Sequence, residues 1–239
     1  MFDRIKKAFS RESRIDGPAP EADAALHAPV ADWAQAGGFE FSLMDRGFAL
    51  DGAMAGKPCR VEVGRPSRKY VIGDELRGRV ELGVDPDVML LLMNRALKDQ
   101  LVRQAYAQFT DSLQTSVDSS LPEEVRLLAM YEELGWDSAP RAFWSRYAVV
   151  ADDRARAAAW LDDAVARQLL EWPAPAPSAD LPFMLMLLRG KAYLRMQQAA
   201  TATPTLRHAV DVFCAACENA RRAFPAAWAF FRNRASPPL

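Results

Sequence analysis

Two cysteines three residues apart, Cys214 and Cys217, form the arrangement in this 239-residue chain that most resembles a reactive motif. A Cys-x-x-Cys pair exchanges disulfides or binds metal mostly at a helix N-terminus, where the helix dipole lowers a thiol pKa. Here the pair falls in the middle of a predicted helix, on the same apolar stripe as Leu206, Val210 and Phe213. Because free cysteine behaves as a small buried hydrophobe, we predict that both thiols belong to the core.

A metal site needs more ligands than the sequence brings together. Zinc takes three or four His, Cys or carboxylate ligands. His27 falls in a predicted linker, and His208 lies on the polar face of its predicted helix, away from the cysteine stripe. The Gly-x-Ser-x-Gly, Gly-x-x-x-x-Gly-Lys-Ser/Thr and Gly-x-Gly-x-x-Gly motifs do not occur in the sequence. We therefore predict no metal site, no cofactor and no catalytic residue.

Paired acids and arginines are the other groups that could do chemistry. The acids are Glu123-Glu124, Glu132-Glu133, Asp152-Asp153 and Asp162-Asp163. General acid–base work requires that burial separate the pKa values of such a pair. Helix starts favour acids through the dipole and through capping, so caps and solvated faces explain these pairs. Arg77 and Arg79 could bind an anion, but cations are ordinary on a solvated sheet face.

A β-α-β-β-α unit in the second half must position most of these groups. Arg146–Val150 ends in β-forming residues and predicts a buried strand. Apolar residues at helical spacing follow and predict a helix. The prolines at 173–177 are predicted to form a stiff loop after this helix. The residues with that spacing are Ala157, Trp160, Leu161, Ala164 and Val165. Phe183–Leu188 and the alternating residues after it predict a hairpin that turns at Arg189-Gly190. The closing helix opens at Thr203-Pro204 and ends before Pro225.

The first half predicts an antiparallel meander followed by a helix. Apolar residues alternate with polar ones in Phe39–Leu43, in a strand that begins at Phe48 and Leu50, in Cys59–Val63 and in Leu76–Leu82, and Ala55-Gly56-Lys57 is predicted to turn the second strand into the third. A four-residue repeat of apolar residues then predicts a helix from about Arg95 onward. Two segments stay open between strand and helix, namely residues 88–93 and residues 122–134. The predicted fold class is therefore α+β.

Several of these stretches resemble uncharacterised bacterial proteins of unknown function. The likeness is carried by Phe48–Gly52, Gly56–Glu62 and Glu75–Leu82, and by a strand like Tyr147–Val150 before a helix like Asp153–Leu170. These are packing and turn residues. The resemblance implies a shared fold and implies no activity.

Composition narrows the class of protein. Half of the residues are hydrophobic and 26% are charged, as in globular proteins. The net charge of −1 gives no reason to expect a nucleic acid partner. No apolar run reaches the roughly 18–20 residues of a membrane span, and the start does not resemble a signal peptide. Three cysteines fit a reducing compartment, so we predict a cytoplasmic protein.

The first fourteen residues are the one functional lead. Five cations against Asp3 and Glu12 give this segment a charge of +3. A basic amphipathic helix can lie on an anionic membrane or dock on a partner. The residues that would make this contact are Phe2, Ile5, Lys6, Lys7, Phe9 and Arg11. The alternative is a terminal helix that packs on its own domain or frays.

We divide the chain into four parts: residues 1–30 as the basic segment and a flexible linker, residues 31–120 as a meander plus helix, residues 121–232 as the β-α-β-β-α unit, and residues 233–239 as a tail. The expected function is a non-catalytic accessory or scaffold protein that recognises another protein, with the inner membrane surface as its candidate location. The alternatives are an enzyme with a site assembled from scattered carboxylates and arginines, and a binder of a small anionic ligand. A deep polar pocket would favour an enzyme, and an open apolar surface would favour a protein partner.

Overall fold

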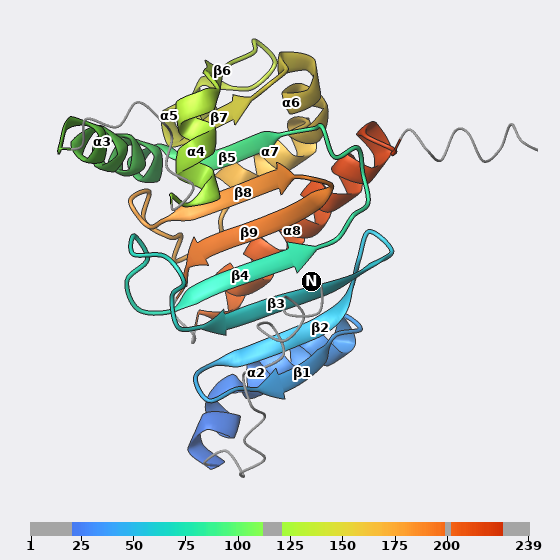
Figure 1. The fold of residues 1–239 in the computed structure, drawn as a ribbon. Helices are drawn as coiled ribbons and strands as arrows, with labels where there is room; N and C mark the ends of the chain where they lie inside the picture. Colours follow the sequence, from blue (N-terminus) through green and yellow to red (C-terminus); the bar gives the residue numbers. More distant parts are fainter. Residues whose placement is uncertain (1–20, 112–120, 199–201, 227–239) are drawn as a thin grey trace, which may run out of the picture.

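The protein has an α+β fold in which one antiparallel sheet carries helices on both faces (Figure 1). The computed structural model describes residues 21–111, 121–198 and 202–226. The strands are β1 (Glu40–Leu43), β2 (Phe48–Met54), β3 (Lys57–Gly64), β4 (Glu75–Val80), β5 (Leu90–Asn94), β6 (Glu133–Leu134), β7 (Tyr147–Ala151), β8 (Phe183–Leu188) and β9 (Lys191–Gln197). The helices are α2 (Glu21–Ala36), α3 (Arg95–Asp111), α4 (Glu123–Met130), α5 (Arg141–Arg146), α6 (Arg154–Trp160), α7 (Asp163–Leu170) and α8 (Thr203–Ala223).

The strand order is β1-β2-β3-β4-β9-β8-β5-β7-β6, so both halves of the chain share one sheet. The predicted meander forms β1 to β4. The predicted hairpin joins β9 to it, with Leu76 opposite Met196. Strand β5 lies between β8 and β7, with Leu92 opposite both Leu185 and Val149. The short strand β6 is the last in the order and therefore forms an edge of the sheet.

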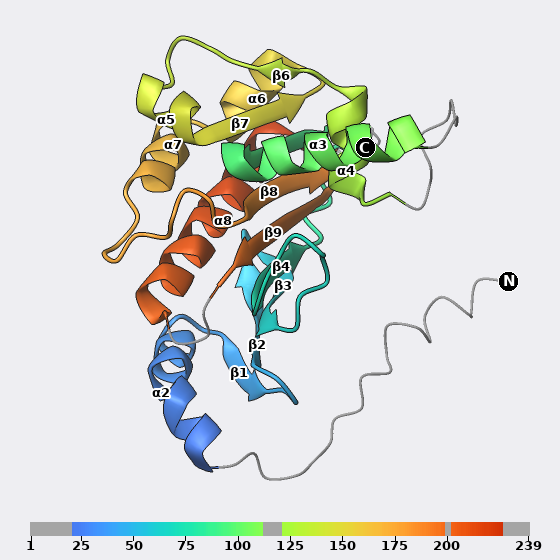
Figure 2. The same ribbon diagram turned by 90° about the vertical axis from the view of Figure 1, so that its left-hand side faces the viewer.

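Two apolar cores lie on opposite faces of this sheet. Figure 2 shows α2, α7 and α8 on one side and α3 and α4 on the other. The larger core includes Phe48, Trp160 and Phe213, each at most 1% exposed. Helices α3 and α4 cover a smaller core rich in methionine, including Met93 and Met184. The smaller core stops near β9, which leaves the outer face of β2, β3 and β4 to polar side chains.

The start of α3 and the Arg189-Gly190 turn are confirmed, and the two segments left open are now assigned. Residues 88–93, left open by the sequence, contribute most of the buried strand β5, and α3 begins at Arg95 as predicted. The segment 122–134 contains helix α4 and then the two-residue strand β6. The hairpin turns at Arg189-Gly190, where φ is 52° and 73°. Two positive φ values are typical of the tight turns that match the twist of a hairpin.

The predicted linker is wrong over residues 21–30, which belong to helix α2. Alanine, the commonest residue in this segment, favours helix, but propensity alone does not offset the proline inside it, Pro29. His27, Val30 and Ala34 lie on one face of the helix and are buried, and the His27 ring meets Phe48 edge to face at 5.1 Å. Burial of this face offsets the hydrogen bond that a proline removes from a helix.

The predicted helix from Asp153 to Leu170 is two helices. Helix α6 ends at Trp160, and Asp162 caps α7 by accepting a hydrogen bond from the Val165 amide at 3.0 Å. The break changes which face the second helix presents to the core. As a result Ala164, predicted to be buried, is exposed, while Val165 stays buried.

No helix in the described part of the chain is long and apolar enough to cross a membrane.

Candidate binding groove

The predicted contact residues near the start of the chain lie outside the described residues. These are Phe2, Ile5, Lys6, Lys7, Phe9 and Arg11. Their proposed contact with a membrane or partner stays a prediction.

The third cysteine, Cys59 on β3, lies near Cys214 and Cys217 on α8, and all three are free thiols. Cys217 is fully buried, Cys59 is buried and Cys214 is half-buried. Burial raises the pKa of the Cys59 thiol to about 11, and the nearby Cys214 adds to the rise. Burial also raises the pKa of Cys214 and of Cys217. Because a thiol with a raised pKa is a poor nucleophile, these groups act as core residues.

The sequence could have placed Cys59 there, because it alternates with the inward-facing Val61 and Val63. Among residues 21–111, 121–198 and 202–226, no three His, Cys, Asp or Glu side chains are placed to hold a metal ion. The two histidines fill other roles. The His208 ring packs against Trp172 at a tilt of 55°, with ring centroids 4.8 Å apart, and its Nε2 lies 2.7 Å from the Gln168 carbonyl oxygen.

The acid pairs serve mainly as caps and ion pairs. Asp153 accepts a hydrogen bond from the Arg156 amide at 2.8 Å at the start of α6. Glu124 is the exception, because its side chain is completely buried. It accepts hydrogen bonds from Arg68 Nε at 2.6 Å and from the Tyr70 hydroxyl at 2.8 Å. Burial acts to raise the pKa of Glu124, but the Arg68 bond and charge outweigh it and hold the pKa below its usual value.

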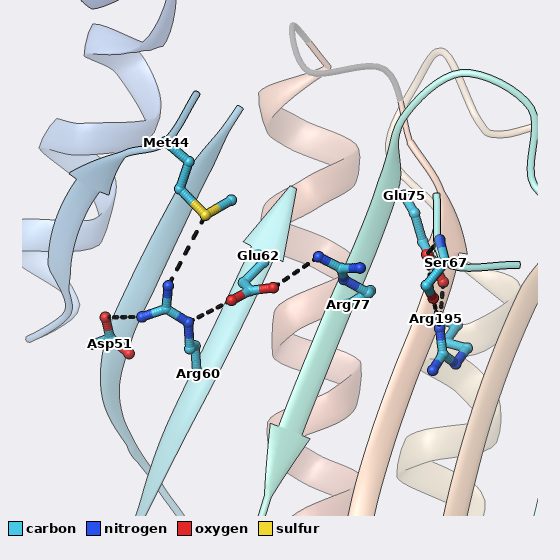
Figure 3. Close-up of polar contacts among 8 residues, drawn as sticks. All are labelled: Met44, Asp51, Arg60, Glu62, Ser67, Glu75, Arg77 and Arg195. Carbon is cyan, nitrogen blue, oxygen red and sulfur yellow. Dashed lines mark hydrogen bonds and ion pairs between the residues drawn. The ribbon is translucent and has the colours of Figure 1, made fainter. Parts of the chain in front are cut away.

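Glu75 is a second buried carboxylate that holds the same β3–β4 loop. Figure 3 shows Glu75, Ser67 and Arg195 gathered in one cluster. It accepts from the Ser67 amide at 2.5 Å, from the Ser67 hydroxyl at 2.8 Å and from Arg195 Nη1 at 2.6 Å. Both carboxylate oxygens of Glu75 are therefore engaged, one by Ser67 and the other by Arg195, and this cluster fixes the loop.

The open face of β2, β3 and β4 carries a chain of ion pairs (Figure 3). Arg60 lies 2.6 Å from Asp51 and 2.5 Å from Glu62, and Glu62 also meets Arg77 at 2.9 Å. Burial acts to raise the pKa of Glu62, but Arg60 and Arg77 together hold it below its usual value. Arg79 pairs with Glu81 at 2.6 Å. An anion at Arg77 or Arg79 would therefore have to displace a carboxylate.

A groove lies where β6 leads into α5. It is open to solvent and has a volume of about 560 Å³. Two indoles in it, Trp136 and Trp144, meet edge to face with centroids 4.8 Å apart, and both are half-buried. Leu134 and Ala139 also line it. The two tryptophans pack on the larger core, so their positions are fixed by the fold.

Four charged residues line the groove. Arg95 and Glu133 form an ion pair, whereas Asp137 and Arg141 pair with no described residue. Arg95 donates through Nε to the Trp144 carbonyl and pairs with Glu133 at 2.8 Å. Lys98 also pairs with Glu133. Burial acts to raise the pKa of Glu133, but Lys98 and Arg95 hold it below its usual value.

Arg141 and Asp137 are the two charged groove residues without a partner in the described part of the chain. Both are exposed, both line the groove, and neither side chain has a hydrogen-bond or ion-pair partner among the described residues. The indole N–H groups of Trp136 and Trp144 likewise donate to no described residue. The groove therefore combines fixed aromatic surface with polar groups that have no partner within the described fold.

Sequence reasoning missed this groove. Trp136 belongs to an irregular segment and Trp144 to the six-residue helix α5, so neither falls in a long periodic pattern. The available signal was the closeness of two tryptophans to Arg141 in a stretch without periodicity.

No protein-family model, curated protein or solved structure matches this chain.

Proposed function

We propose that this chain is a non-catalytic recognition module that binds a segment of another protein in the groove beside β6. The observation that carries the proposal is the pair of fixed indoles, Trp136 and Trp144, next to the unpartnered guanidinium of Arg141. Tryptophan and arginine are enriched among the residues that dominate binding energy at protein interfaces. Fixed aromatic side chains also lose little conformational freedom when a partner binds.

The edge position of β6 supports an extended partner segment. Within the described part of the sheet, β6 pairs with β7 alone, with Leu134 opposite Val149. An unpaired strand edge presents N–H and C=O groups to which another strand can add. Peptide segments use this mode, in which main-chain bonds give affinity and pockets for alternate side chains give specificity.

The groove electrostatics favour binding over acid–base catalysis. A general acid or base works best when its pKa lies near the operating pH. The pKa of Glu133 is instead held below its usual value, because Lys98 and Arg95 stabilise the carboxylate. That carboxylate is already committed to orienting Arg95.

The basic segment 1–14 could bring this module to an anionic membrane surface. Its charge of +3 and its apolar residues Phe2, Ile5 and Phe9 motivate this part of the proposal. Each cation near an anionic surface contributes about 1 kcal/mol, a term that salt weakens. Attachment of this kind is reversible.

Affinity capture with matched variants tests the proposal. Wild type, Trp136→Ala/Arg141→Gln and Trp33→Ala/Arg154→Gln are immobilised and exposed to extract from the cells that produce the protein. The control removes a half-buried tryptophan that stacks on Phe39 and an exposed arginine that begins α6. We expect a partner that wild type and control retain and the groove variant loses. Equal retention by all three would place recognition elsewhere.

A further inference from the structure

We infer that the groove selects partner segments in which an acidic side chain accompanies a large apolar one. This inference rests on the proposed function and specifies its ligand class. It follows from the charged groups and hydrogen-bond donors in and beside the groove. Some of these groups already have partners in the fold, and the others remain available to a ligand.

The satisfied groups are Arg95 and Glu133, which line the groove, and Lys98, which pairs with Glu133 from outside the lining. Glu133 is bound by two cations at once, so it offers little negative potential to a ligand. Arg95 donates a hydrogen bond from Nε to the Trp144 carbonyl oxygen and another from Nη2 to Glu133. These three groups together leave one excess positive charge beside the groove.

The groups left for a ligand are mainly donors. Arg141 has five N–H donors and no described partner, and Trp136 and Trp144 each carry an indole N–H without one. Guanidinium binds a carboxylate with two parallel hydrogen bonds, which is a stronger contact than a neutral one. A carboxylate is the side-chain group of a peptide that matches this set of donors.

The apolar requirement comes from the two indoles. Trp136 and Trp144 share the groove with Leu134 and Ala139, so part of its surface gains nothing from a polar ligand. Aromatic and large aliphatic side chains bury the most apolar area against an indole. A ligand with an acidic residue alone would leave the apolar surface of the groove exposed to solvent.

Asp137 is the one free negative charge among the groove residues described, and it opposes an acidic ligand. Replacing Asp137 therefore tests whether the groove prefers acidic or basic peptides. Asp137→Asn removes the repulsion and should strengthen binding of acidic peptides by a few-fold. A groove that selected basic segments would show the reverse, because Asp137 would then be the attractive group.

The experiment is selection from a displayed library of random linear peptides, using full-length wild type, Arg141→Gln, Arg141→Glu, Asp137→Asn, Trp136→Ala and the control Arg154→Gln. Enriched peptides are then synthesised and their Kd values measured by fluorescence anisotropy. Circular dichroism of each variant confirms that it is folded. Arg141 and Arg154 are matched because both are exposed and each is the first residue of a short helix.

We expect wild type to enrich peptides with Asp or Glu beside a large apolar residue. Arg141→Gln should bind them about tenfold more weakly, as for an interface hot spot. Arg154→Gln should bind them as wild type does. Arg141→Glu should enrich Lys or Arg instead, because the charge that selects the ligand is reversed.

The unfavourable outcomes separate the two claims. Peptides that need Trp136 but show no acidic preference, or that bind equally well to Arg141→Gln, would overturn this inference and leave the proposed function standing. A selection in which no enriched peptide depends on Trp136 would overturn the proposed function and the inference with it.

Discussion

Replacing Glu124 by alanine tests how the β3–β4 loop is held against α4. The substitution leaves the Tyr70 hydroxyl, now bonded at 2.8 Å, without an acceptor in a buried site. An unsatisfied buried group costs about 1–3 kcal/mol. It also leaves Arg68 without its carboxylate, and breaking a buried ion pair costs about 3–5 kcal/mol. The Arg68 side chain is 25% exposed and can turn to water, which lowers this second cost.

We therefore expect Glu124→Ala to reduce the free energy of unfolding by about 3 kcal/mol. For a domain of this size that corresponds to a fall in Tm of about 6–12 °C. Glu124→Gln keeps an acceptor for Tyr70 and loses only the charge, so it should cost about 1–2 kcal/mol. The control Glu132→Ala changes an exposed acid between α4 and β6 and should stay within about 0.5 kcal/mol.

The pH dependence of the same variants has a defined sign. Because the folded-state pKa of Glu124 lies below its usual value, this carboxylate stabilises the fold above the unfolded-state pKa, about 4.3. That contribution disappears as the pH falls through the folded-state pKa. The difference between wild type and Glu124→Gln should thus shrink on acidification. Urea unfolding followed by circular dichroism measures both effects. If Glu124→Ala unfolds like Glu132→Ala at neutral pH, Glu124 does not hold the loop.

Three further predictions follow from single positions or segments. Gly190→Val should cost about 2–3 kcal/mol because φ is +73° and a Cβ would lie 3.0 Å from the Val84 carbonyl oxygen. Gly190→Asn shares this Cβ contact but should cost less, because Asn adopts positive φ more readily than the β-branched Val; equal losses in urea unfolding would show that backbone conformation does not decide the effect. Cys217→Ser should cost about 1–3 kcal/mol through a buried hydroxyl and Cys217→Ala less, while native thiol labelling should reach Cys214 before Cys59 or Cys217; fast labelling of Cys217 would contradict its burial. Flotation with liposomes should show binding of the full chain to anionic vesicles at low salt, lost in a chain that starts at Asp16; full-length protein that stays soluble would exclude the membrane hypothesis.

Strong local patterns explain what the sequence could predict. Alternation in the first half fixes which side of β2 to β4 faces the core, so Leu50, Val61 and Leu76 are buried. The stripe on α8 likewise buries Leu206, Val210 and Phe213 in the larger core. The Arg189-Gly190 turn follows from glycine's tolerance of positive φ.

Long-range pairing and weak local signals explain the rest. The pairing of β4 with β9 joins segments separated by more than a hundred residues, and periodicity carries no information about which strand pairs with which. The correction to α2 shows tertiary burial of His27 and Val30 outweighing a proline. At the break before α7, the Asp162 cap outweighs an apolar spacing that continues across it in the sequence. The groove depends on residues from β6, a loop, α3 and α5, which only the folded chain brings together.

Site-specific photo-crosslinking in the producing cells tests the central claim of partner recognition most directly. A photoreactive phenylalanine replaces Asp137 inside the groove or, as a control, Ala159, which is exposed on α6. We predict a discrete crosslinked adduct with another protein from position 137, lost when Trp136→Ala is added, and no such adduct from position 159. An absence of adducts from position 137, or the same adducts from both positions, would contradict recognition through the groove.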